Sequence, residues 1–139
     1  MILLDTNVLS ELMKPTPEKR VVAWMGAQPS QSLYTTSITQ AEILHGVMLL
    51  PSGRRRKAFE AAAEGMFREE FAGRVLSFGS EAALPYALIA VDRRRAGRPI
   101  SHFDAQIAAI ARSTGATVAT RNVTDFEGCG VRLLNPWNG

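Results

Sequence analysis

The sequence contains only one cysteine, Cys129, among its 139 residues. A single cysteine excludes a disulfide within the chain, and we therefore expect a cytoplasmic protein in a reducing compartment. No apolar run approaches the ~20 residues that span a bilayer, and the opening MILLD lacks the basic flank of a secretory signal. We therefore expect no membrane association.

Lysine is also scarce, since it occurs only at positions 14, 19 and 57. Phosphatases with a DxDxT motif and phosphoacceptor receiver domains both pair an aspartate with a lysine. Here the first strand is followed by DTNVL, which lacks the second aspartate, and no lysine lies between Lys57 and the last block of the sequence. These absences argue against both classes of α/β protein.

The chain has no internal repeat, low-complexity tract or linker, so we expect a single domain over residues 1–139. Apolar residues make up 46% and charged residues 21%, which is typical of a folded globular protein. The formal net charge of +3 permits a polyanionic partner but does not establish one.

Short apolar runs alternate with helical patterns along the chain. The runs lack regular polar alternation, which is typical of strands buried on both faces of a parallel sheet. Helical spacing of apolar residues appears in the stretch 54–72, in a second stretch that ends at Gly97, and in a third that ends at Gly115. The alternation predicts βαβ units and an α/β sandwich. The expected strands are Ile2–Leu4, Leu33–Thr36, Val75–Phe78, Thr117–Ala119 and Val131–Leu134.

Acidic residues stand at strand ends and helix beginnings. Asp5 follows the first strand directly, and Glu42 is expected in the first turn of the helix after the second strand. Asp104 is expected in the first turn of a later helix, and Asn122 and Asp125 follow the fourth strand. Such positions line the crevice beyond the carboxyl ends of parallel strands, where α/β proteins bind ligands. Four carboxylates gathered there would need a hard divalent cation to offset their repulsion.

A purely structural interpretation also fits three of these acids. Asp5 is different, because a carboxylate that ends a buried strand is costly unless it is solvated, hydrogen-bonded or bound to a metal. The remaining acids have the spacing of helix caps, in the pairs Thr39 with Glu42, Ser101 with Asp104, and Asn122 with Asp125.

Three blocks of sequence, in this order, resemble one known family: ILLDTNVLSEL, TTSITQAEILHGV and DAQIAAIARSTGATVATRNVTDFEGCGVRLLNPW. They are similar to PIN-domain ribonucleases, and in particular to VapC-type toxins of the FitB-like subgroup. The resemblance implies a three-layer α/β/α sandwich with a five-stranded, mainly parallel sheet. It also implies an endoribonuclease toxin that uses Mg²⁺ or Mn²⁺ to hydrolyse RNA. A DNA-binding antitoxin, a homodimer and a toxin–antitoxin hetero-oligomer would accompany it.

The resemblance carries over residue by residue. It implies catalytic roles for Asp5, Glu42, Asp104 and Asp125, with Asp5 and Asp104 as the direct metal ligands. Asn122 also fits the fourth acidic position, and we prefer Asp125 with Asn122 in support. The resemblance further implies that Asn7 and Thr120 brace the site.

One position departs from the family. Many relatives have an additional aspartate where this chain has His102. The histidine could contact phosphate, or it could be an ordinary residue at a helix start. The change leaves open a catalytically weak PIN-like module that binds protein or RNA. Arg54 and Arg55 are basic residues that open a helix. Cations at a helix start are unfavourable without a partner anion, so these residues could contact the substrate; the alternative is an ordinary solvated face.

Overall fold

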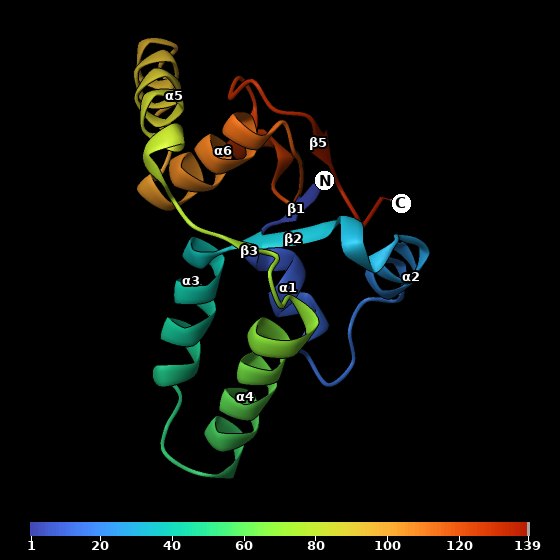
Figure 1. The fold of residues 1–139 in the computed structure, drawn as a ribbon. Coiled ribbons are helices and arrows are strands. Elements are labelled where there is room, and N and C mark those ends of the chain that lie inside the picture. The colour runs from blue at the N-terminus through green and yellow to red at the C-terminus, as the bar shows by residue number, and fades with distance from the viewer. Residues whose placement is uncertain (139) are drawn as a thin grey trace.

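A five-stranded parallel sheet forms the centre of the computed structural model, which describes residues 1–138 (Figure 1). The strand order is β3-β2-β1-β4-β5, and every neighbouring pair is parallel. All five predicted strands are present. The third and fifth are shorter than predicted, because only two residues of each pair with a neighbour. The strands are β1 (Ile2–Leu4), β2 (Leu33–Thr36), β3 (Val75–Leu76), β4 (Thr117–Ala119) and β5 (Leu133–Leu134).

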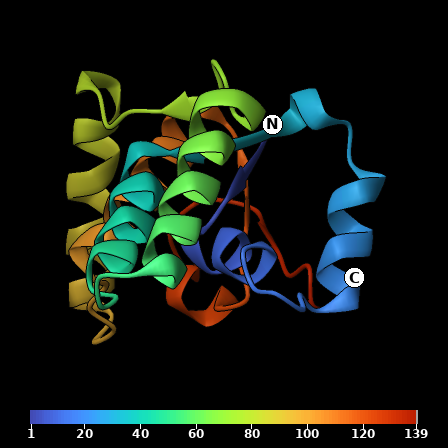
Figure 2. The same cartoon turned by 90° about the horizontal axis from the view of Figure 1, so that it is seen from below.

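Helices cover both faces of the sheet and confirm the α/β/α sandwich. Figure 1 shows α5 (Ala83–Arg95) and α6 (His102–Thr114) above the sheet, with α1 (Thr6–Leu12), α3 (Ser37–Met48) and α4 (Arg54–Gly65) below it. Seen from below, α3 and α4 lie side by side, and α2 (Lys19–Ala27) stands near the C-terminus (Figure 2). Within residues 1–138, no helix combines the length and apolar character needed to cross a membrane.

The stretch predicted as a helix over 54–72 is divided in the structure. The α-helix α4 ends at Gly65 and continues as a π-helical turn, Met66–Glu70. Three short 3₁₀ helices complete the secondary structure of the described residues: Ser30–Ser32, Ser80–Ala82 and Val123–Phe126.

Two apolar clusters form the core, one on each face of the sheet. Leu3 packs in the cluster beneath α5 and α6, whereas Leu4 packs with α1 and α3 on the opposite face. Val118 and Ala119 of β4 divide in the same way, because successive residues of a strand point to opposite faces. Strands β1 and β4 therefore bury side chains on both faces, as the sequence indicated.

Helix α6 is held close to the sheet by its small side chains. Its buried face includes Ala105 and Ala108, which are at most 1% exposed. The helix begins at the predicted cap, where the Ser101 hydroxyl accepts a hydrogen bond from the backbone N–H of Asp104 at 3.1 Å. It ends at Gly115, which has φ 72°, a conformation that glycine adopts readily.

Helix α3 begins earlier than the sequence predicted. Its cap is Thr36, the last residue of β2, whose hydroxyl accepts from the backbone N–H of Thr39 at 3.0 Å. The expected capping box of Thr39 with Glu42 is therefore wrong, and Glu42 lies in the second turn of α3. The strand runs directly into the helix, so the first available hydroxyl caps it.

Arg93 joins the end of α5 to the loop that follows β4. This side chain is only 7% exposed and donates hydrogen bonds to the backbone carbonyls of Arg98, Asp125 and Glu127, at 2.7, 2.7 and 3.1 Å. The cationic run 93–95 forms the last turn of α5. One member of the run is nevertheless a buried structural residue.

We expect Arg93→Ala to lower the free energy of unfolding by about 2–3 kcal/mol, because three carbonyls lose a charged donor. The neighbouring Arg94 is exposed, so Arg94→Ala should change stability by less than about 0.5 kcal/mol. Urea unfolding of the two variants measures both values. Equal stability of the two variants would contradict the anchoring role of Arg93.

Candidate active site

Asp5 is a buried carboxylate at the carboxyl end of β1. Its side chain is 4% exposed, and it caps helix α1 by accepting from the backbone N–H of Thr6 at 2.8 Å. Its own backbone N–H donates to the carbonyl of Ala119 at 3.0 Å, so it continues the pairing of β1 with β4. The sheet thus fixes the position of this carboxylate.

Two polar residues hold the second oxygen of Asp5. The hydroxyl of Thr120, which follows β4, donates to Asp5 Oδ2 at 2.8 Å, and the amide of Asn7 donates to the same oxygen at 3.1 Å. The Asn7 amide also lies 3.2 Å from the Thr120 hydroxyl. Both residues therefore contact the Asp5 carboxylate directly, and their bracing role in the site stays a prediction.

Glu42, on α3, lies near Asp5 through a shared neighbour, Thr6. Its Oε1 accepts from the hydroxyl of Thr6 at 2.8 Å, and that hydroxyl also contacts the hydroxyl of Thr39 at 3.1 Å. Thr6 thus joins the first helix to α3, and its backbone and side chain contact two different carboxylates.

Asp104 approaches from the first turn of α6. Asp5, Glu42 and Asp104 line one open cavity of about 420 Å³ at the carboxyl edge of the sheet. Asn7 and Asn122 add amide groups to its wall. The structure therefore brings together three of the four predicted acids, from β1, α3 and α6.

Burial and mutual repulsion raise the pKa values of two of these acids. Burial is the main cause for Asp5 and raises its pKa from 3.8 to about 6; hydrogen bonds from Thr120 and Thr6 oppose the rise, and the charges of Asp104 and Glu42 add to it. The pKa of Asp104 is raised mainly by partial burial, with further contributions from Asp125 and Glu42. The donors to Asp5 are all neutral, so no protein cation offsets its charge directly.

The remaining predicted site residues lie at or beyond the edge of this cavity. Asn122 lines the cavity, whereas Asp125 is exposed and does not. The charge of Asp125 contributes to the raised pKa of Asp104. The predicted cap at Asn122 is also wrong, because its side chain makes no capping hydrogen bond and only a 3₁₀ turn follows.

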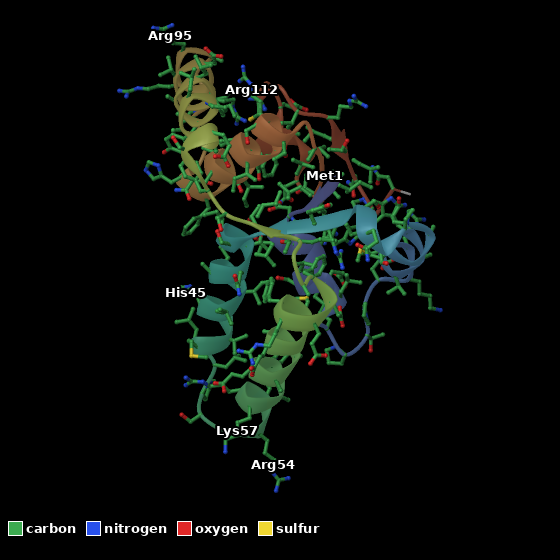
Figure 3. All side chains as sticks on the ribbon, viewed as in Figure 1. Met1, His45, Arg54, Lys57, Arg95 and Arg112 are labelled. Carbon is green, nitrogen blue, oxygen red and sulfur yellow. The ribbon has the colours of Figure 1, made fainter. Side chains whose placement is uncertain are left out.

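His102 and Arg54 do not line the acidic cavity. His102 is exposed at the first position of α6, and its Nδ1 lies 2.9 Å from the hydroxyl of Tyr86 on α5. Figure 3 shows Arg54 and Lys57 at the outer tip of α4. An ordinary residue at a helix start is the better interpretation of His102.

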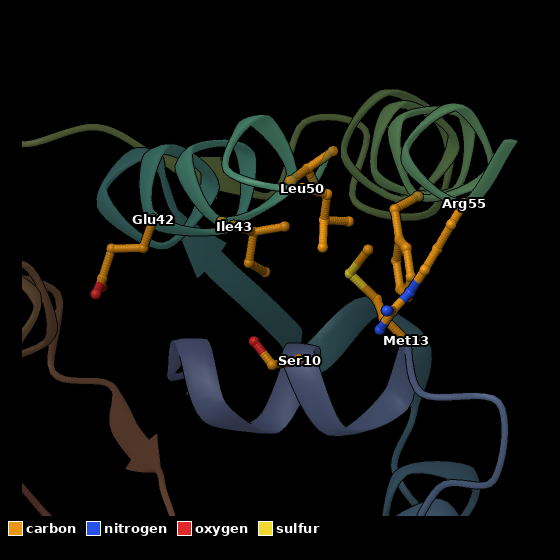
Figure 4. Close-up of a pocket in the computed structure, with 9 residues that line it drawn as sticks. Ser10, Met13, Glu42, Ile43, Leu50 and Arg55 are labelled. Carbon is orange, nitrogen blue, oxygen red and sulfur yellow. The ribbon is translucent and has the colours of Figure 1, made fainter. Parts of the chain in front are cut away.

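Arg55 lines a second cavity that adjoins the acidic one. This groove, about 210 Å³, runs between α1, α3 and α4, and Figure 4 shows Glu42 at one end and Arg55 at the other. Apolar side chains such as Met13, Ile43 and Leu50 form its floor. Glu42 and Ser10 line both cavities, so the groove opens into the acidic site.

The sequence reasoning missed several residues of the cavity wall. Thr6 stands between two predicted site residues in the DTN stretch, and that position alone was a usable indication. Glu11 lies one helical turn beyond Asn7 on α1, and Lys14 follows the end of that helix. Arg121 and Trp137 also line the cavity. They are sixteen residues apart, and no spacing rule relates them.

The cavity suits a hard divalent cation with much of its water retained. Its acidic ligands are carboxylate oxygens, and burial, with the repulsion between the acids added, raises the pKa values of Asp5 and Asp104. In the part of the chain that the structure describes, no three His, Cys, Asp or Glu residues are grouped closely enough to hold a metal. Mg²⁺ binds through one or two carboxylates with several waters, so Asp5 and Asp104 are a fitting pair.

The fold and these carboxylates define a class of protein, and comparison with known proteins agrees. The family model described as PIN domain matches residues 2–127. The chain belongs to the PIN-domain family. VapC ribonuclease Y4jK of Sinorhizobium fredii is 42% identical over 137 residues, which cover 99% of this chain and 98% of that protein.

Two further similarities concern FitB. Toxin FitB of Neisseria gonorrhoeae is 40% identical over 138 residues, with 99% of each chain covered. A chain in the solved structure of FitAB bound to an IR36 DNA fragment matches with a TM-score of 0.93 at 40% identity. That match covers 99% of this chain and 96% of the other.

The raised pKa of Asp5 predicts how stability depends on pH in chelator. Between pH 4 and 6 the unfolded chain has released the proton that folded Asp5 still holds, so stability should fall as pH rises through this range. A rise in pKa from 3.8 to about 6 corresponds to about 3 kcal/mol. Asp5→Asn should flatten this slope and be at least as stable as the parent at pH 7, as urea unfolding in EDTA would measure.

Asp92→Asn is the matched control, because Asp92 is exposed on α5 and does not line the cavity. Its stability should follow the parent's at each pH. The raised pKa of Asp5 would be contradicted if the free energy of unfolding changed between pH 4 and 6 by the same amount in the parent and in Asp5→Asn.

Proposed function

We propose that this protein is a metal-dependent endoribonuclease and the toxin component of a toxin–antitoxin pair. The observation that carries the proposal is the convergence of Asp5, Glu42 and Asp104 on one cavity at the carboxyl edge of the sheet. Membership of the PIN-domain family and the similarity to VapC ribonuclease Y4jK and toxin FitB support it.

The chain's own residues would divide the work of hydrolysing a phosphodiester. Asp5 and Asp104 would hold Mg²⁺ or Mn²⁺, which supplies a Lewis acid that acidifies water and neutralises phosphate charge. Glu42, oriented by the Thr6 hydroxyl, would accept a hydrogen bond from the attacking water and position it. Thr120 and Asn7 would hold the Asp5 carboxylate in one orientation.

Burial of Asp5 would also favour the cation. In the absence of metal, the carboxylate has neutral donors and acidic neighbours, so protons compete for it up to about pH 6. A divalent cation would replace that proton and offset the repulsion from Glu42 and Asp104. We therefore infer that metal affinity falls as the pH drops below 6.

We expect Asp5→Asn and Asp104→Asn each to reduce RNA cleavage by about a hundredfold or more, because each removes a charge that stabilises the transition state through the metal. Total bacterial RNA incubated with purified protein and Mn²⁺ gives the readout. Calorimetric titration of Mn²⁺ into chelator-stripped protein should show binding by the parent and loss in both variants.

Asp92→Asn serves again as the control and should cleave like the parent. Cleavage by Asp5→Asn at the parent's rate would show that the site is assigned wrongly. If the parent neither binds Mn²⁺ nor cleaves RNA, the result would favour the catalytically weak binding module instead.

Asp125 remains our proposed fourth acid, with Asn122 in support, and the two residues should respond differently to substitution. Asp125 acts on the cavity through its charge, so Asp125→Asn should weaken Mn²⁺ binding by less than tenfold and lower the pKa of Asp104. Asn122 lines the cavity, so Asn122→Ala should slow cleavage with little change in that pKa. Carbon-detected NMR titration of the carboxyl groups separates these effects. A loss of metal binding in Asp125→Asn as large as in Asp104→Asn would make Asp125 a direct ligand.

An antitoxin is the proposed partner. The matching solved structures include FitAB bound to DNA, which matches this chain at 40% identity. The groove between α1, α3 and α4 offers an apolar floor with Arg55 at one end and Glu42 at the other. A partner segment seated there would reach the acidic cavity directly, because the two cavities share Ser10 and Glu42. We propose a homodimer and a toxin–antitoxin hetero-oligomer on the same basis.

A further inference from the structure

A third cavity, distinct from the groove that Arg55 lines, continues the acidic cavity on the side of α1 and the C-terminus. It is about 470 Å³ in volume and reaches Lys19 and Pro17. Four residues line both cavities and so form the passage between them: Glu11, Lys14, Arg121 and Trp137. A polymer that enters the acidic cavity from this side must pass over these four side chains.

The guanidinium of Arg121 lies over the ring of Trp137 in this passage. Its guanidinium carbon lies 5.2 Å from the centroid of the indole ring, and the residue is exposed. Its backbone is held on both sides: the N–H donates to Asn7 Oδ1 at 3.1 Å, and the carbonyl accepts from Asn135 at 3.4 Å. Arg121 is therefore tied to Asn7, which also holds the Asp5 carboxylate.

Trp137 is itself fixed in place. It packs against the core cluster on the α1 face, and its carbonyl accepts from Arg20 of α2 at 3.3 Å. Its backbone N–H donates to Asn135 Oδ1 at 2.9 Å. Figures 1 and 2 both place the C-terminus beside α2. The indole is thus a rigid support for the guanidinium above it.

The charge on this wall is opposite to that of the acidic cavity. Glu11 is buried, pairs with Lys14 at 2.9 Å and accepts from the backbone N–H of Glu18, and these bonds hold its pKa below the usual value. Glu11, Lys14 and Arg121 together carry one net positive charge, and the Lys14 side chain, which is 58% exposed, remains open to an anion from solvent. Glu18 and Lys19 further along the cavity balance one another.

We propose that Arg121, Trp137 and Lys14 form a subsite for a nucleotide of single-stranded RNA beside the one whose phosphate enters the acidic cavity. The base stacks on the Arg121–Trp137 pair, and Lys14 and Arg121 contact the neighbouring phosphate. A stacked guanidinium and aromatic ring recognise any unpaired base, and the adjoining cations recognise the backbone. This subsite rests on the proposed ribonuclease function and gives its substrate a direction of entry.

The test uses the fluorescence of Trp137 itself. The chain has two tryptophans, so a Trp24→Phe background leaves Trp137 as the only one. A fluorescein-labelled single-stranded RNA of random sequence is titrated into this protein in EDTA, so that cleavage plays no part. The anisotropy of the fluorescein gives the dissociation constant. A second titration with an unlabelled copy of the RNA gives the change in Trp137 fluorescence on binding. We expect quenching of Trp137, and a dissociation constant raised at least about fivefold by Arg121→Ala.

Two further variants separate stacking from charge and from unfolding. Arg121→Lys keeps the charge and loses the plane, so its affinity should fall between the parent and Arg121→Ala. Arg95→Ala removes an arginine at the outer end of α5 (Figure 3) and should bind like the parent. Matching thermal unfolding curves confirm that the variants are folded.

The subsite would be overturned if the dissociation constant of Arg121→Ala in EDTA lay within twofold of the parent's and Trp137 fluorescence did not change at saturation. Failure of the parent to bind this RNA would overturn it as well. Neither result depends on cleavage. Loss of the ribonuclease proposal would instead appear as Arg121-dependent binding without any metal-dependent cleavage.

Discussion

The burial of Asp5 at the end of β1 is the constraint on which the site depends. A carboxylate with 4% exposure can remain there because three neutral donors contact it and it lines an open cavity. Those donors come from both sides of the sheet edge, from α1 and from the end of β4. The same bonds therefore close the helix cap, join the two central strands and orient the acid.

The cost of this arrangement is the burial of Asp5 and Asp104, which raises their pKa values, with the repulsion among the neighbouring acids adding to the rise. A protein that kept such a cluster for structure alone would gain stability by neutralising it. The divalent cation that we propose for this site would offset the cost of the cluster. The local instability and the proposed metal site are thus two consequences of one geometry.

The surroundings of the acids divide into chemically different walls. On the α3 and α4 side, an apolar groove with Arg55 at its far end opens toward Glu42. On the α2 and C-terminal side, Arg121 and Trp137 form a basic and aromatic wall. An apolar protein segment fits the first wall and an RNA strand the second, so we infer that partner and substrate approach the same acids from different directions.

The sequence by itself determined the strands, the helix pattern and the parallel sheet, because each depends on apolar periodicity and on caps read from neighbouring residues. It also placed Asp5, Glu42 and Asp104 at the carboxyl edge, since parallel strands bring their ends together. It misplaced the beginning of α3, because Thr36 was counted only as a strand residue. Only the tertiary structure decided that Asn122 lines the cavity while Asp125 does not, because a turn of four residues directs their side chains differently. It alone paired Arg121 with Trp137, because their contact depends on how the chain end packs beside α2, and no local rule of spacing contains that information.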